Sequence, residues 1–143
     1  MSKAHHSSHI KTGPARVLLV IVFLILCGGH FAFWKFGFYN GRPNPNLPAM
    51  PGLVIGSCLA STVMIGAIWI RKALARTALI VFLWIMMFVF SIPGLMMMSD
   101  RTSLQTGALQ MLGAGLGAYL IANIILIVAE PIHRLGATRG CRS

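Results

Sequence analysis

Long runs of apolar residues dominate the pattern along the chain. Four runs contain no Asp, Glu, Lys or Arg: residues 17–34, 51–70, 77–98 and 102–129. Each run reaches the roughly 20 residues that a helix needs to cross the hydrocarbon core of a bilayer. The apolar residues are continuous rather than alternating, which argues against the strands of a transmembrane barrel. We therefore predict an all-α fold, an integral membrane four-helix bundle with spans at about residues 15–37, 51–71, 76–98 and 105–130.

The domain organisation follows from these spans. We expect one transmembrane domain over residues 16–131, between basic tails at residues 1–15 and 132–143. The composition agrees, since 57% of the residues are hydrophobic and 10% are charged. Soluble domains carry about 25% charged residues. A water-soluble core of this size cannot hide so much apolar side chain.

The basic residues predict the orientation in the membrane. Nine of the twelve Lys and Arg lie before the first span, between the second and third, or after the fourth: Lys3, Lys11, Arg16, Arg71, Lys72, Arg76, Arg134, Arg139 and Arg142. Only Lys35, Arg42 and Arg101 lie on the other side. Because cytoplasmic segments carry the excess of Lys and Arg, both termini are predicted to be cytoplasmic, in a multi-pass protein of the bacterial inner membrane. The net charge of +10 predicts contact with anionic lipid headgroups rather than nucleic acid, because the charges lie at the span ends.

His30 is the only histidine inside a predicted span and is the first candidate for a functional site. Ionisable groups at membrane depth usually turn toward the bundle interior or a wet cavity. Counting helical rise from the span ends places Gln110 at a depth similar to that of His30. With Cys27, Ser57 and Ser61, these two residues predict a small polar pocket that opens to the outer side. The alternative interpretation is structural, with His30 making one interhelical hydrogen bond, most simply to Gln110.

Metal chemistry is a further hypothesis for the same region. Cys27 and His30 are spaced i, i+3, and Met97 belongs to a run of methionines at the outer end of the third span. Thiolate, imidazole and thioether are soft ligands that suit Cu(I), so these three residues are candidate copper ligands. The only acids are Asp100 and Glu130, and neither lies inside an apolar run. Their scarcity argues against hydrolytic catalysis and against proton-coupled transport, so no catalytic residue and no resident cofactor are predicted.

Small residues predict the faces through which helices pack. They recur at every fourth position in the second span and again in the fourth: Gly52, Gly56 and Ala60, then Gly113 and Gly117. Such stripes let helix backbones approach closely within a membrane. We expect the two stripes either to pack on each other or to face a partner chain.

Several motifs in residues 28–98 occur in a fixed order. Gly29-His30-Phe31 comes late in the first span, Leu47-Pro48 lies in a Pro-rich outer loop, and the segment RKALARTALIVFLWIMMFVFSIPG combines a basic turn with the end of the third span. This order resembles the DoxX-like group of small four-span membrane proteins. The resemblance implies the four-span fold and a link to quinone-related redox partners and oxidative-stress complexes. Those relatives often carry an acid in the second span, where this chain has only Ser, Cys and Thr, so an activity that depends on that acid is not expected here.

These observations favour a protein without enzymatic activity. The predicted function is that of an accessory or scaffold subunit that binds lipid, a larger membrane protein or further copies of itself. The alternative is a redox-associated subunit that contacts quinone or copper through the pocket around His30. A third class is a small permeation or lysis protein, although the spans hold few polar residues to line a pore.

Overall fold

The computed structural model describes residues 13–39, 42–43, 47–70, 73–99 and 106–132 of the chain. Four helices make up almost all of this part: α1 (Gly13–Phe36), α2 (Met50–Trp69), α3 (Ala73–Ser99) and α4 (Thr106–Val128). A pair of two-residue antiparallel strands, β1 (Phe38–Tyr39) and β2 (Arg42–Pro43), follows α1. Most of the two predicted tails, with all of their basic residues, lies outside the described part, which includes only residues 13–15 and 132 of them. Outside it too are Arg71, Lys72 and Arg101.

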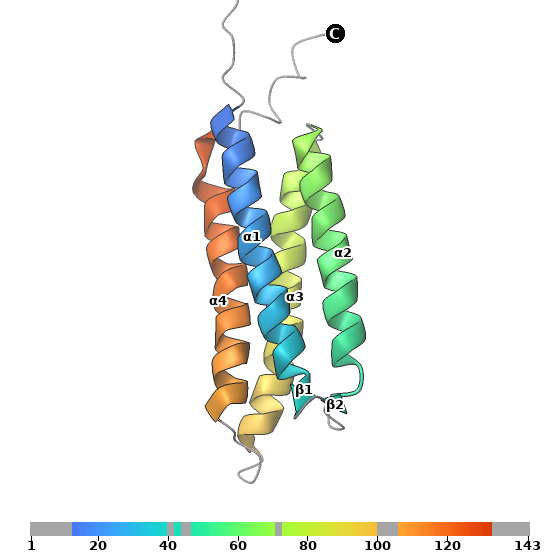
Figure 1. The fold of residues 1–143 in the computed structure, drawn as a ribbon. Coiled ribbons are helices and arrows are strands. Elements are labelled where there is room, and N and C mark those ends of the chain that lie inside the picture. Colours follow the sequence, from blue (N-terminus) through green and yellow to red (C-terminus); the bar gives the residue numbers. More distant parts are fainter. Residues whose placement is uncertain (1–12, 40–41, 44–46, 71–72, 100–105, 133–143) are drawn as a thin grey trace, which may run out of the picture.

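All four helices are long enough and apolar enough to span a membrane. The prediction of an all-α bundle with four spans is therefore confirmed, and the helix ends differ from the predicted ones by only a few residues. Figure 1 shows that α1 begins and α4 ends at the same end of the bundle, which we call the terminal end. We call the opposite end, where α1 ends and α2 begins, the loop end.

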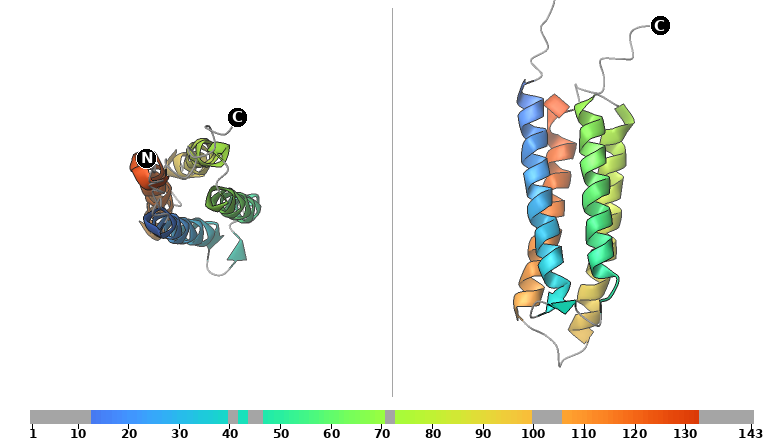
Figure 2. Two further views of the ribbon diagram at one scale, coloured as in Figure 1. Left: turned by 90° about the horizontal axis from the view of Figure 1, so that it is seen from above. Right: turned by 45° about the vertical axis from the view of Figure 1, so that its right-hand side comes forward.

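The helices form a ring rather than a layer (Figure 2). Each helix contacts two neighbours, in the order α4, α1, α2, α3 and back to α4. Consequently α2 and α4 lie at opposite corners, and both run from the loop end to the terminal end. The most extensive contact joins α1 to α4, the first and last helices of the chain.

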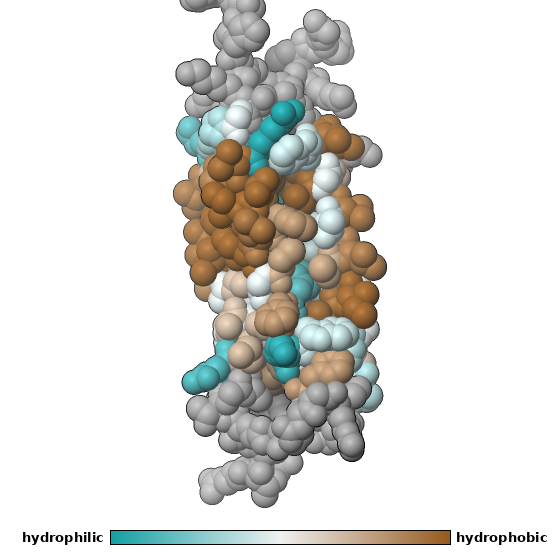
Figure 3. All heavy atoms as spheres, in the orientation of Figure 1, coloured by the Kyte–Doolittle hydropathy of each residue, from teal (hydrophilic) through white to brown (hydrophobic). Residues whose placement is uncertain are grey.

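The apolar side chains divide between the bundle centre and its outer surface. Fully buried residues such as Leu19, Leu83 and Leu126 fill the centre. Many equally apolar side chains point outward, and Val63 and Phe88 have more than two thirds of their surface exposed. Figure 3 shows such residues gathered over the terminal half of α1 and α4 and along α2. A helix that is apolar on all sides belongs in a bilayer, where lipid tails cover the outward face.

Three single glycines, rather than the predicted stripes, form the close contacts inside the bundle. A Cβ atom added to Gly29 of α1 would lie 2.9 Å from Cβ of Ala118 on α4. One added to Gly115 would lie 2.6 Å from the ring of Phe33, and one added to Gly94 would meet the side chain of Leu112. The backbones therefore approach closely at these positions because glycine has no side chain there.

The predicted packing of the two small-residue stripes on each other is wrong within the chain. No atom lies within 4 Å of a Cβ built on Gly52, Gly56, Gly113 or Gly117, and Ala60 is only half-buried. The physical reason is the ring order, which places α2 and α4 at opposite corners and turns their stripes outward. Contact of these stripes with a partner chain remains a prediction.

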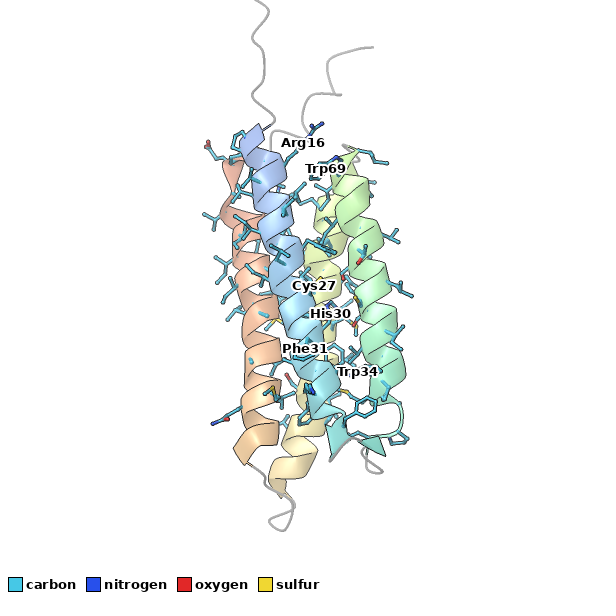
Figure 4. All side chains as sticks on the ribbon, in the orientation of Figure 1. Arg16, Cys27, His30, Phe31, Trp34 and Trp69 are labelled. Atoms are coloured by element: carbon cyan, nitrogen blue, oxygen red, sulfur yellow. The ribbon has the colours of Figure 1, made fainter. Side chains whose placement is uncertain are left out.

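Arginine side chains secure the terminal end. Nε of Arg76, in the first turn of α3, donates to the carbonyl of Leu126 at 2.8 Å, and Nη2 donates to that of Ile127 at 3.3 Å. These carbonyls belong to the last turn of α4, which carries the negative end of the helix dipole. The guanidinium of Arg16 on α1 lies 5.3 Å from the ring centre of Trp69 on α2, which is a cation–π contact. Figure 4 labels both residues. These contacts tie neighbouring helices together where the spans end.

The orientation of the bundle can be measured by labelling from outside intact cells. In a background whose native cysteines are replaced, single cysteines placed at Asn44 or Ser103 are expected to react with an impermeant maleimide. Cysteines at Ser7, Ala73 or Thr138 are expected to react only after the cells are opened, because the excess of basic residues predicts that these positions are cytoplasmic. Reaction at Ala73 in intact cells would reverse the predicted orientation.

Candidate functional site

The interior of the bundle contains a small group of polar side chains. The buried polar residues in the described ranges are His30, Ser57, Ser61 and Asn123, and the fully buried Tyr119 joins them through its hydroxyl. We call these five residues the polar column. They come from α1, α2 and α4 and are all buried inside the bundle. Buried polar groups at membrane depth are costly and usually serve packing or function, which makes the column the candidate site.

His30 forms hydrogen bonds through both ring nitrogens. It projects from α1 toward the other helices (Figure 4) and is 5% exposed. Nδ1 lies 2.6 Å from the carbonyl oxygen of Leu26, and Nε2 lies 2.8 Å from the hydroxyl of Tyr119 on α4. A carbonyl oxygen can only accept, so Nδ1 must carry the proton. In the neutral ring Nε2 is then the acceptor, and the hydroxyl of Tyr119 donates to it.

Aromatic packing holds the tyrosine hydroxyl in place. The ring of Tyr119 meets those of Phe33 and Phe90 edge to face, with centres 5.3 and 6.0 Å apart. Phe33 and Phe90 themselves stack at 4.1 Å. The hydroxyl lies 3.5 Å from Oγ of Ser57, at the outer limit for a hydrogen bond. Ser57 donates to the carbonyl of Val54 at 3.0 Å. Because the tyrosine proton goes to His30 and the serine proton to Val54, the contact between Tyr119 and Ser57 is not a hydrogen bond. This first layer of the column therefore hydrogen-bonds α1 to α4 and brings α2 into contact with them.

A second polar layer lies one turn closer to the terminal end. Asn123 of α4 is fully buried, and its Nδ2 lies 3.9 Å from Sδ of Met87 on α3. Its Oδ1 has no hydrogen-bond partner among the described residues. Ser61 of α2 donates to the carbonyl of Cys58 at 3.0 Å. This second layer thus presents a buried acceptor whose hydrogen-bonding capacity the described residues do not use.

The structure brings together some of the residues predicted from the sequence and separates others. His30, Ser57 and Ser61 all face the centre, as the predicted pocket required. Cys27 is only half-buried on α1, and Figure 4 places it one turn from His30. Gln110 is exposed and takes no part in the polar column.

The predicted pairing of His30 with Gln110 is wrong, although the partner helix is the predicted one. Gly29 faces Ala118 and Phe33 faces Gly115, so residue numbers fall on α4 as they rise along α1. This register places Gln110 beside or beyond the last turn of α1, about 12 Å along the axis from the level of His30. Tyr119 occupies the position that was assigned to the glutamine.

Tyr119 and Asn123 were missed as site residues. They stand four residues apart in an otherwise apolar segment of α4, a spacing that puts both on one helix face. Their position on one face of an apolar helix indicates that both side chains point toward the bundle interior, and this pattern can be recognised in the sequence.

The soft ligands proposed for copper do not form a cluster among the described residues. No group of three or more His, Cys, Asp and Glu in the described ranges could hold a metal ion. The Nε2 lone pair of His30 is already engaged by Tyr119, and the side chain of Met97 lies outside the described part. The part of the chain that the structure describes therefore shows no ligand set for copper, and the role of Met97 stays a prediction.

Comparisons with protein-family models, with curated proteins and with solved structures find no match. The resemblance to the DoxX-like group therefore rests only on the motifs described above. The fold and its apolar surface support a four-span integral membrane protein, and they place a polar column at its centre.

Proposed function

We propose that this protein acts without enzymatic chemistry, as an accessory or scaffold subunit that binds a larger membrane protein. The observation that supports this proposal most is the engagement of His30. Both ring nitrogens are bonded within the chain and the side chain is almost fully buried, so this histidine is engaged in helix packing. Interhelical hydrogen bonds of this kind hold membrane helices together without presenting a group to a substrate.

The outward glycine faces supply a surface for the partner. Gly52 and Gly56 on α2, and Gly113 and Gly117 on α4, have open space where a side chain would be. Lipid tails gain little by covering a glycine, whereas another helix gains van der Waals contact by approaching it closely. Both stripes lie in the loop halves of helices that run in the same direction. Because α2 and α4 lie at opposite corners of the ring, a partner helix would dock on one stripe or the other, near the loop end of the bundle.

Leucine substitutions at the stripes test the proposed surface. Gly56→Leu and Gly117→Leu are expected to leave the detergent stability of the bundle unchanged, because neither position has a neighbour within the chain. At least one of them is expected to reduce the recovery of a partner that co-purifies with the unaltered protein in mild detergent, because the added side chain prevents close approach. The measurement is quantitative mass spectrometry of the purified complexes.

Gly28→Leu is the matched control for these variants. Gly28 on α1 is exposed and equally free of neighbours within 4 Å, but it lies outside both stripes. A partner that is kept by Gly28→Leu and lost from either stripe variant supports the proposal. If both stripe variants keep the same partner, the stripes are not the surface that binds it.

The same purification separates the alternatives. A stoichiometric quinone or copper ion in the purified protein would favour the redox-associated subunit, and a homo-oligomer that passes ions in vesicles would favour a permeation protein. Location in the bacterial inner membrane and binding of anionic lipid by the basic segments belong to the same proposal. They draw support from the charge distribution along the sequence.

A further inference from the structure

Two cysteines lie on the neighbouring helices that the contact between Arg16 and Trp69 joins. Cys27 belongs to α1 and Cys58 to α2, and both are free and half-buried. Cys27 follows Arg16 by 11 residues, and Cys58 precedes Trp69 by 11 residues. Eleven residues are about three turns of an α-helix. Each cysteine therefore lies on the same face of its helix as the residue that makes the contact, and the two faces are turned toward each other.

Contacts along the two helices show that the cysteines also lie at one depth. The helices run in opposite directions, so residue numbers fall on α2 as they rise along α1 (Figure 1). Near the loop end, a Cβ atom built on Gly37 would lie 3.1 Å from Cγ of Met50. Midway, the hydroxyl of Tyr119 lies 2.8 Å from Nε2 of His30 and 3.5 Å from Oγ of Ser57, which puts these two residues at one level. In this register the two cysteines lie opposite each other to within about two residues, or about 3 Å along the axis.

The distance between packed helices suits a bond between these two side chains. Packed helices have their axes about 8–10 Å apart, and their Cα atoms lie about 2.3 Å from each axis. Directly facing Cα atoms are thus about 4–5 Å apart, and those nearer the edge of the contact are a little farther apart. A disulfide needs Cα atoms about 4.4–6.8 Å apart. The thiol groups of Cys27 and Cys58 also interact electrostatically. We call these two cysteines the thiol pair.

The position within the spans restricts the chemistry of the thiol pair. Two thiolates that bind one monovalent soft ion carry a net negative charge, which is costly at membrane depth. A disulfide is uncharged and has no such cost. Half burial leaves part of each cysteine open on the side of the bundle that faces lipid. A reagent that reaches the thiol pair therefore arrives dissolved in the bilayer.

We propose that Cys27 and Cys58 are a modification site, at which a hydroperoxide dissolved in the membrane oxidises the two thiols to a disulfide between α1 and α2. One sulfur first takes the terminal oxygen of the hydroperoxide. The O–O bond breaks, an S–O bond forms, and the thiol proton goes to the other oxygen, which leaves as an alcohol. The second sulfur then attacks the sulfenic acid, so that the S–S bond forms, the S–O bond breaks and water leaves. The two thiols lose two electrons, and the hydroperoxide gains them.

Peptide mapping without reductant tests the proposal. The sequence has three cysteines, so Cys141→Ser leaves only the thiol pair. This full-length variant, in bilayers of phosphatidylcholine and phosphatidylglycerol, is treated with cumene hydroperoxide, and free thiols are then blocked with N-ethylmaleimide. Cleavage after lysine in denaturant places the two cysteines on different peptides, residues 12–35 and 36–72.

The two peptides are expected to stay joined after oxidation, with a mass lower by two hydrogen atoms than that of the two free peptides together. They are expected to separate when a thiol reductant is added. Separate peptides that each carry one maleimide after oxidation would overturn the proposal. A disulfide that joins two copies of the chain, seen as a dimer before cleavage, would overturn it as well.

A cysteine moved by one residue is the matched control. Cys58→Ser combined with Leu59→Cys keeps the second thiol at nearly the same depth but turns it by about 100° around α2. Leu59 is 64% exposed, so this change leaves the bundle centre untouched. The yield of joined peptides is expected to fall by about tenfold or more, because cysteines that point apart cannot be bridged without movement of the backbone. Equal yields from the two arrangements would mean that the thiols meet without a defined geometry, which would overturn the assignment of the site.

Discussion

Replacing Gly115 by alanine is expected to destabilise the bundle by about 1–3 kcal/mol, the usual cost of overpacking a filled core. The new methyl group would lie 2.6 Å from Cε1 of Phe33 and 2.7 Å from Cζ. Phe33 cannot move aside easily, because it is fully buried and stacked on Phe90. The change therefore has to push α1 and α4 apart or distort the aromatic cluster beside Tyr119.

Gly117→Ala is the control for this prediction, because it makes the same change two residues further along α4. No atom lies within 4 Å of the added methyl group, so the free energy of unfolding is expected to stay the same or to rise slightly. Both variants are compared by unfolding in mixed micelles of mild detergent and sodium dodecyl sulfate. Equal stability of the two would contradict the assignment of Gly115 to the α1–α4 interface.

The hydrogen bond between His30 and Tyr119 is expected to show as an energetic coupling between the two residues. Tyr119→Phe leaves Nε2 of His30 buried without a donor, which costs about 1–3 kcal/mol. His30→Leu removes the acceptor and leaves the tyrosine hydroxyl with only the long contact to Ser57. The double variant leaves neither group unpaired, so it should lose less stability than the two single losses together.

A double-mutant cycle in the same micelles measures this coupling. Interhelical hydrogen bonds in membrane proteins are worth about 0.6 kcal/mol on average and up to about 1.7 kcal/mol, and we expect a value within this range. Ser91→Ala on α3 is a suitable control, because that hydroxyl donates to the carbonyl of Met87 within its own helix. A coupling of zero would mean that the two side chains do not interact in the folded bundle.

The sequence predicts the spans well because length and apolarity alone define them. The ends of α2 and α4 lie within about two residues of those expected, since charges and turn residues border the apolar runs. The inward orientation of His30, Ser57 and Ser61 was also predictable, because lipid cannot satisfy a polar side chain. These predictions rest on properties of single helices.

The pairing between helices could not be obtained in the same way. Counting from each span end assumes that all helices start at one level, but the register of α1 against α4 is set by Gly29 and Gly115. Counting from the span ends therefore predicts Gln110 at the level of His30, about two helical turns deeper in the bundle than the structure has it. A small-residue stripe likewise does not reveal whether it faces inward. Gly52 and Gly117 belong to such stripes and face outward, while Gly115, which lies between two stripe glycines in the sequence, faces the ring of Phe33.

The ring arrangement also has a consequence for the biosynthesis of the chain. The most extensive interface joins α1 to α4, and synthesis proceeds from the N-terminus. This interface can close only after the ribosome has delivered the fourth span to the membrane. During that interval His30 lacks Tyr119, and the carbonyl of Leu26 in its own helix is the partner that remains. A nascent chain arrested before α4 should therefore keep Phe33 accessible to lipid, and release of the last span completes the core.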